Sequence, residues 1–253
     1  MNEALMTQYV ETYKKNIHMQ IQQNTLQKYT GKPDVDDKRL FFTLLPLLNG
    51  ENWDQTVKVS AISVSLIFAA LAAHDLVKED NATAKSQQLQ VLAGDYYSGR
   101  YYQLLANENM IDLIQQLSNG VSKITEHKTR FYDLEDYSFE ALVQSIQLIE
   151  SKPIEQFLEY HSYHEYVFIM KEALLLAALK KEVVAYEKGE KTFYISKSKI
   201  FQKNMDVLRQ EIDKIEHALV MDVRSSELLN ESLKRAILER VCEHSLEQQL
   251  REG

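Results

Sequence analysis

The segment AISVSLIFAALAA at residues 61–73 decides the fold class. Placed on a helix, it is apolar on every side, and Ser63 and Ser65 are its polar positions. A helix that is apolar all round lies buried in a protein or in a membrane. A membrane-spanning helix needs about 20 apolar residues, and this run is shorter. We therefore expect the central helix of a protein core and no transmembrane segment.

The rest of the chain also has the pattern of a helical protein. The 253 residues include 7 Gly and 3 Pro, and 45% are hydrophobic. This scarcity of turn residues argues against sandwiches, barrels and Gly-rich phosphate loops. Helical periodicity predicts one all-α domain over residues 1–253, with about eight to ten helices. The expected helices span residues 3–28, 38–48, 56–79, 85–106, 110–130, 139–149, 155–188, 197–218 and 227–249.

Residues 91–105 are also rich in apolar and aromatic side chains, so we expect two buried helices at the centre, wrapped by amphipathic ones. Pro153 suits the start of one of the outer helices, because proline is tolerated in a first turn. Gly189 suits the end of the same helix.

Charge and cysteine content exclude several classes of protein. The formal net charge is −8, and dense Lys/Arg blocks are lacking, so nucleic acid is not an expected partner. The single cysteine, Cys242, rules out a disulfide framework and a Cys-based metal site. The first residues are polar and do not resemble a signal peptide, which predicts a cytoplasmic protein.

Polar residues stand out on the two apolar helices, because an unpaired buried charge is costly. Asp75 and Glu79 lie a turn apart on one face of the first helix. On the second helix, Asp95 points about 140° away from Arg100, so the two cannot pair with each other. Each residue therefore needs a partner of opposite charge or a hydrogen-bonding group on a facing helix, a second chain or a ligand. The simplest arrangement is an internal ion pair such as Arg100 with Asp75.

Two further motifs carry weaker signals. Gly94 and Gly99 have the spacing of a phosphate loop, but Arg100 and Tyr101 follow where Lys and Ser/Thr belong. We interpret the glycines as sites of close helix approach. His161 and His164 lie three residues apart, a spacing compatible with metal binding, but the sequence marks no third ligand, which favours a surface pair.

Four tyrosines, Tyr96, Tyr97, Tyr101 and Tyr102, cluster within seven residues. Aromatic rings with a polar end suit three places: a packed core, a tunnel for an apolar ligand, or a protein interface. Core packing is the default interpretation, and the other two stay open.

The segments AHDLVKED at residues 73–80 and QVLAGDYYSGRYYQLLA at residues 90–106 resemble trans-prenyl diphosphate synthases. The resemblance implies an all-α bundle around a central cavity. Catalytic members carry Leu-His-Asp-Asp-x-x-Asp, whose aspartates bind magnesium and a diphosphate. Here His74 and Asp75 match, Leu76 replaces the second aspartate and Glu79 the third. The Arg-Arg-Gly segment is missing, and no second Asp-Asp-x-x-Asp follows downstream.

Within that group, residues 60–130 are similar to the small subunit, component I, of the two-component heptaprenyl or hexaprenyl diphosphate synthases of Gram-positive bacteria. This resemblance implies a heterodimer with a catalytic large subunit, component II, which holds Mg²⁺ and elongates farnesyl diphosphate with isopentenyl diphosphate for the menaquinone side chain. The small subunit is needed for activity and product length, and it holds no catalytic residue, cofactor or metal itself.

On this interpretation, one set of residues contributes to the heterodimer contact or lines a substrate tunnel: Asp75, Glu79, Gly94, Asp95, Tyr96, Tyr97, Gly99, Arg100 and Tyr101. Arg100 would meet a charge across the interface or a diphosphate. Two alternatives stay open. One is an autonomous helical terpenoid enzyme with an atypical metal site, and the other is a helical adaptor unrelated to isoprenoids.

Overall fold

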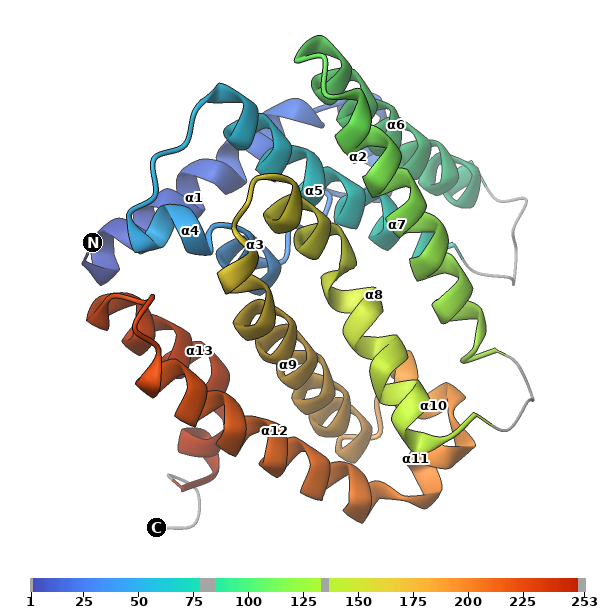
Figure 1. Cartoon of the computed structure of the whole chain (residues 1–253). Helices are drawn as coiled ribbons and strands as arrows, with labels where there is room; N and C mark the ends of the chain where they lie inside the picture. Colours follow the sequence, from blue (N-terminus) through green and yellow to red (C-terminus); the bar gives the residue numbers. More distant parts are fainter. Residues whose placement is uncertain (1, 78–84, 133–136, 250–253) are drawn as a thin grey trace.

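The computed structural model describes residues 2–77, 85–132 and 137–249, with the backbone alone described from residue 243 onward. This part of the chain is helical and contains no strand, which confirms the all-α prediction. The helices, shown in Figure 1, are α1 (Glu3–Gln20), α2 (Asn24–Thr30), α3 (Asp37–Thr43), α4 (Leu45–Asn49), α5 (Gln55–Asp75), α6 (Lys85–Asn107), α7 (Ile111–Thr129), α8 (Phe139–Tyr160), α9 (Val167–Glu187), α10 (Tyr194–Lys197), α11 (Lys199–Lys203), α12 (Met205–Ser225) and α13 (Glu231–Gln249). A 3₁₀ turn (His164–Tyr166) precedes α9.

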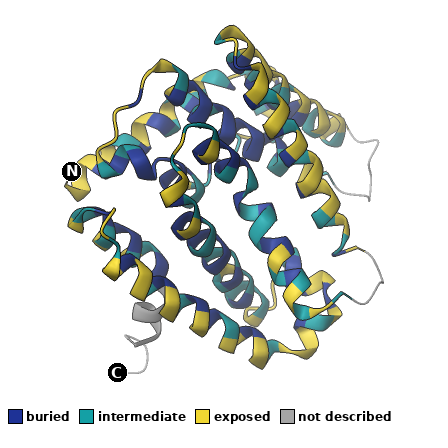
Figure 2. Cartoon of the chain, viewed as in Figure 1, coloured by how far each residue is buried: buried dark blue, intermediate teal, exposed yellow. Residues whose placement is uncertain are grey.

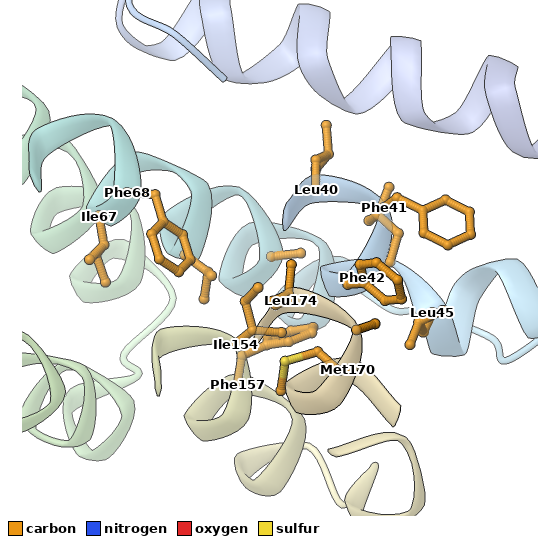
Figure 3. Close-up of a cluster of buried hydrophobic side chains, with 14 of the residues drawn as sticks. Leu40, Phe41, Phe42, Leu45, Ile67, Phe68, Ile154, Phe157, Met170 and Leu174 are labelled. Carbon is orange, nitrogen blue, oxygen red and sulfur yellow. The ribbon is translucent and has the colours of Figure 1, made fainter. Parts of the chain in front are cut away.

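The core is centred on α5 and α9, which Figure 2 shows as largely buried. In the cluster of Figure 3, Phe157 and Ile154 of α8 lie with Met170 and Leu174 of α9, and Phe68 of α5 is part of the same core. By length and composition, α5 is apolar enough to cross a membrane, but 72% of its most apolar window is buried in this fold. A buried core helix passes the same test, and packing of this extent accounts for the composition of α5.

The helix boundaries differ from the prediction where local hydrogen bonds or packing override the pattern. The expected helix 3–28 divides into α1 and α2, because the side chain of Gln23 accepts a hydrogen bond from the amide of Leu26 and starts a new helix. Pro153 does not begin a helix. It is buried inside α8, which continues through it. The loss of one backbone hydrogen bond at a proline is outweighed there by packing of the flanking residues.

The expected central pair of buried helices is wrong for its second member. The helix α6 buries one side, including Ala93, Tyr97 and Tyr101, while Leu92 is 53% exposed. Figure 1 shows α6 beside α7 at one edge of the molecule, whereas α9 takes the inner position next to α8. The second apolar segment therefore combines a buried side with an outer side, carrying Leu92, that the described part of the chain leaves exposed.

The N-terminal and C-terminal parts of the chain are joined by one polar cluster at Asn49. The side-chain oxygen of Asn49 accepts hydrogen bonds from the backbone and side-chain nitrogens of Asn230, each at 2.9 Å and over a sequence separation of 181 residues. The Asn49 amide nitrogen donates to the Tyr166 hydroxyl at 2.8 Å and to the carbonyl of Leu228 at 2.9 Å. This arrangement ties the end of α4 to the start of α13.

Candidate partner interface and cavity

At Gly94, α6 lies directly against the side chain of His74, near the end of α5. A Cβ atom at this position would be 2.5 Å from two ring atoms of His74, which is shorter than a real Cβ contact. The same ring places its Nε2 atom 3.8 Å from a carboxylate oxygen of Asp95. The glycine thus allows the His74 ring to lie flat against α6. Gly94 therefore lies in the contact between α6 and α5, against a side chain of α5.

The tyrosines on the inner side of α6 pack within this chain. Tyr97 and Tyr101 are 2% and 3% exposed, and Tyr96 is half-buried. Burial raises the pKa of both the Tyr97 and the Tyr101 hydroxyls above the usual range. The rings of Tyr101 and Tyr102 stack with centroids 4.2 Å apart. Tyr97 and Tyr101 are therefore core residues, as the default interpretation predicted.

The opposite side of α6 is exposed along its whole length. We call it the outer face of α6 and define it by its exposed residues Gln88, Leu92, Asp95, Gly99, Tyr102 and Ala106. Their spacing alternates between four and three residues, the pattern of helices that pack side by side at a shallow angle. At its middle, no described atom lies within 4 Å of a Cβ built on Gly99. Gly99 is therefore not a point of close helix approach within the described part of the chain, and its contact with a partner helix stays a prediction.

The charged residues have partners other than those expected. The Nε atom of Arg100 donates to the backbone oxygen of Gln20 at 2.9 Å, and Nη2 donates to the Gln20 side-chain oxygen at 2.6 Å. Arg100 also donates to the side chain of Gln103. Asp75 binds the ammonium group of Lys128 at 2.5 Å. The predicted Arg100–Asp75 ion pair is therefore wrong. Arg100 instead connects α6 to the end of α1 through its hydrogen bonds with Gln20.

A cavity of about 680 Å³ lies between α3, α5, α8, α9 and α10. Phe68, Ile149 and Leu174 give it an apolar wall, and Ala72 and Ala178 are among the small side chains that leave it open. Its lining also includes many polar groups, among them two ion pairs: Asp75 with Lys128, and Arg39 with Glu150.

Sequence reasoning missed Arg39, Glu150 and Lys128. Arg39 and Glu150 are 111 residues apart, so linear spacing carries no sign of their pairing. Arg39 does precede the buried run Leu40–Thr43, and a charge beside such a run is a signal that a buried partner exists.

The residues at the Asp75 end of the cavity do not fit a magnesium–diphosphate cluster. Such a cluster needs several carboxylates around the cation. The Asp75 carboxylate is bound to Lys128, and the next residue, Leu76, exposes its side chain by 62%. Over the described ranges, no group of three or more His, Cys, Asp or Glu side chains is placed to hold a metal. Glu79 lies outside the described residues.

The two histidines His161 and His164 do not share a helix. His161 is the C-terminal cap of α8, with its ring against those of Phe157 and Tyr160, and His164 opens the 3₁₀ turn. Burial lowers the pKa of His161. The expectation of a surface pair is therefore wrong for His161, whose ring is half-buried.

Solved structures similar to this chain define its class by fold. A geranylgeranyl pyrophosphate synthase from Lactobacillus brevis matches with a TM-score of 0.69 and 11% identity, covering 94% of this chain and 96% of that one. A heptaprenyl diphosphate synthase from Staphylococcus aureus matches with a TM-score of 0.59 and 13% identity, covering 94% and 91%. The chain has the all-α fold of the trans-prenyl diphosphate synthases.

The family described as heptaprenyl diphosphate synthase (HEPPP synthase) subunit 1 matches residues 24–229, and the chain belongs to this family. A relative, heptaprenyl diphosphate synthase component 1 of Geobacillus stearothermophilus, is 40% identical over 90 residues. That match covers 36% of this chain and 41% of the relative. The resemblance predicted from residues 60–130 is confirmed, and the family match extends well beyond them.

Proposed function

We propose that this chain is the non-catalytic small subunit of a two-component trans-polyprenyl diphosphate synthase. Membership of a family named for its first subunit carries the proposal, because such a name implies a second component. The pairing of Asp75 with Lys128 supports it further. The Lys128 ammonium group is bound to the Asp75 carboxylate, which would otherwise be the first ligand of a metal. In this proposal the metal is therefore bound by the partner.

The proposed complex elongates farnesyl diphosphate with isopentenyl diphosphate to a heptaprenyl-type product for the menaquinone side chain. The catalytic large subunit holds Mg²⁺ and both diphosphates in this proposal. The small subunit is cytoplasmic, carries no cofactor, and is required for activity and for product length. These points rest on the family resemblance.

We propose that the partner docks on the outer face of α6. Leu92 and Tyr102 offer apolar surface on either side of Gly99, and Gly99 allows a second helix to come close. The shallow crossing expected from the spacing of this face suits a helix of the partner lying along α6. Asp95, with 63% of its side chain exposed, would then face a cationic group of the partner.

Co-expression with the candidate catalytic subunit tests this function. The chain, the partner and the co-purified pair are each supplied with farnesyl diphosphate, labelled isopentenyl diphosphate and Mg²⁺, and the product length is measured. We expect a stable heterodimer and long-chain product from the pair alone. Turnover by this chain alone would support the autonomous-enzyme alternative. Equal product from the partner with and without this chain would contradict a required subunit.

A further inference from the structure

A second cavity of about 620 Å³ lies between α1, the connection from α4 to α5, and the start of α5. We call it the α1–α5 groove and define it by six lining residues: Tyr9, Tyr13, Asn16, Asn52, Trp53 and Gln55. The lining residues Asn52 and Gln55 are exposed, so the groove is open to solvent. Its volume lies within the range of ~300–1,000 Å³ that is typical of ligand sites.

The lining of the α1–α5 groove is nearly uncharged but rich in hydrogen-bonding groups. Its charged residues are one acid, Glu51, and one base, Lys58. Three of its side-chain amides, those of Asn16, Asn52 and Gln55, make no hydrogen bond within the described part of the chain. Each amide side chain can both donate and accept. The groove therefore suits an uncharged ligand that also donates and accepts, and a peptide backbone has this chemistry.

A buried tyrosine adds a hydrogen-bond donor to this lining. Tyr13 is 6% exposed, and its ring packs edge-on against that of Trp53 with centroids 6.1 Å apart. Burial raises the pKa of Tyr13, so its hydroxyl keeps its proton at neutral pH. No group among the described residues bonds with this hydroxyl, and an unpaired buried polar group is costly. A carbonyl group bound in the groove would supply the acceptor.

The length of the groove fits a short extended segment. Tyr9 and Gln20 both line it and are eleven residues apart on α1, which corresponds to about 16 Å along the helix axis. At ~3.3 Å per residue, this length accommodates about five residues of an extended chain. A helical ligand satisfies its own backbone groups and would leave the lining amides unpaired. An extended segment presents free N–H and C=O groups to them.

The groove is continuous with the surface on which the partner is proposed to dock. Gln20, at one end of the groove, accepts the two hydrogen bonds from Arg100 that connect α1 to α6. Arg100 directly follows Gly99, the middle residue of the outer face of α6. A partner that lies along this face can therefore reach the groove with an adjoining segment.

We propose that the α1–α5 groove binds an extended segment of about five residues from the catalytic subunit. Asn16 of α1 and Gln55 of α5 hydrogen-bond the backbone of this segment from opposite sides, and the Tyr13 hydroxyl donates to one of its carbonyl groups. The choice of the catalytic subunit as the source of the segment rests on the proposed function.

The chain carries its own reporter for this test, because Trp53 is its single tryptophan. The full-length chain is labelled with fluorotryptophan, and its fluorine NMR signal is followed while overlapping synthetic peptides that cover the catalytic subunit are added at millimolar concentration. We expect peptides from one stretch of that sequence to shift the signal. The inference is overturned if none of the peptides does so. A shift that depends on the concentration of this chain alone would assign the groove to a second copy and equally overturn it.

The double variant Asn16→Ala/Gln55→Ala provides the second measurement. We expect it to bind both the active peptide and the whole catalytic subunit about tenfold more weakly, because it removes two amide contacts. The matched control Gln8→Ala/Gln210→Ala removes two exposed amides that lie outside the groove and should bind like the wild type. Urea midpoints of both variants verify that the fold is retained.

The outcomes separate this inference from the proposed function. An active pair whose affinity is the same in the wild type and in Asn16→Ala/Gln55→Ala overturns the peptide site and leaves the small-subunit function standing. Failure of the wild-type chain to form an active pair counts against the proposed function, and the peptide titration, which omits the folded catalytic subunit, still decides whether the groove binds a segment of it.

Discussion

The inner and outer faces of α6 belong to the same helix but have different surroundings. On the inner face, Gly94 is packed so tightly that a methyl group would strike His74, and Tyr97 is buried. On the outer face, a methyl group on Gly99 would meet open space, and Leu92 is exposed. Glycine thus serves packing within the chain at one position and leaves room for a second chain at the other. Changes on the two faces should separate stability from pairing.

The largest effect is expected on the inner face. Tyr97→Ala removes a ring that is 2% exposed, and truncation of a buried aromatic residue typically costs about 3–5 kcal/mol. We expect the free energy of unfolding to fall by roughly 3 kcal/mol or more in urea titrations. Tyr102→Ala on the outer face is the matched control, with an expected loss under about 1.5 kcal/mol. Equal losses would break the distinction between the faces.

The next effect is expected on the outer face and in pairing alone. Leu92→Asp places a charge on the apolar surface beside Asp95, and truncations at the centre of an interface often cost about 2 kcal/mol or more. We expect affinity for the catalytic subunit, measured by calorimetry, to fall at least about 30-fold, with the urea midpoint of the isolated chain unchanged. Val207→Asp changes a comparably exposed residue of α12 and serves as the control. Equal effects of the two changes on affinity would place the interface elsewhere.

Alanine at the two glycines should have smaller effects of opposite sign. Gly99→Ala adds helix propensity in an exposed position and should stabilise the isolated chain by about 0.5–1 kcal/mol. Gly94→Ala brings the same gain but forces the His74 ring aside, so we expect a net loss of about 1 kcal/mol. Thermal unfolding of both variants measures the difference. If both variants were more stable than the wild type, the His74 ring would move aside at little cost.

The smallest effect concerns pH and tests the interior away from α6. Burial lowers the pKa of His127 and of His161. The unfolded chain, with an ordinary histidine pKa near about 6.5, then binds more protons than the folded chain, so stability falls as the pH drops through that value. We expect a lower urea midpoint at pH 5.5 than at pH 7.5, and a shallower dependence in the double variant His127→Gln/His161→Gln. An unchanged slope would contradict this origin of the dependence.

The sequence predicted the features that depend on local pattern. The apolar segment at 61–73 became the buried helix α5, and α6 and α7 begin and end within a residue or so of their expected bounds. The continuity of α8 through Pro153 was missed, because packing around a buried proline is not visible in the sequence. Periodicity showed that Asp95 and Arg100 need separate partners, but the contact of Arg100 with Gln20 spans 80 residues. The partners of charged groups depend on tertiary structure.

For the candidate site too, the sequence predicted what depends on local pattern and missed what depends on tertiary contacts. Motif spacing singled out Asp75 and the Gly94–Tyr101 segment, and their place at a partner interface stays a prediction. Which side of α6 points outward depended on the contact with α5, so the buried Tyr97 and Tyr101 were included with the exposed Gly99. Arg39, Glu150 and Tyr194 come from three distant parts of the chain, so their network around the cavity depends on the tertiary structure.

The Asn49–Asn230 contact has a consequence for the order of folding during synthesis. Helices α5 and α6 are neighbours in sequence and can pair early, while the partner of Asn49 is 181 residues further along and is synthesised long after both helices. Closing so long a loop costs roughly 3 kcal/mol more in chain entropy than closing the short α5–α6 connection. If folding accompanies synthesis, we therefore expect the outer face of α6 to form before Asn230 reaches Asn49.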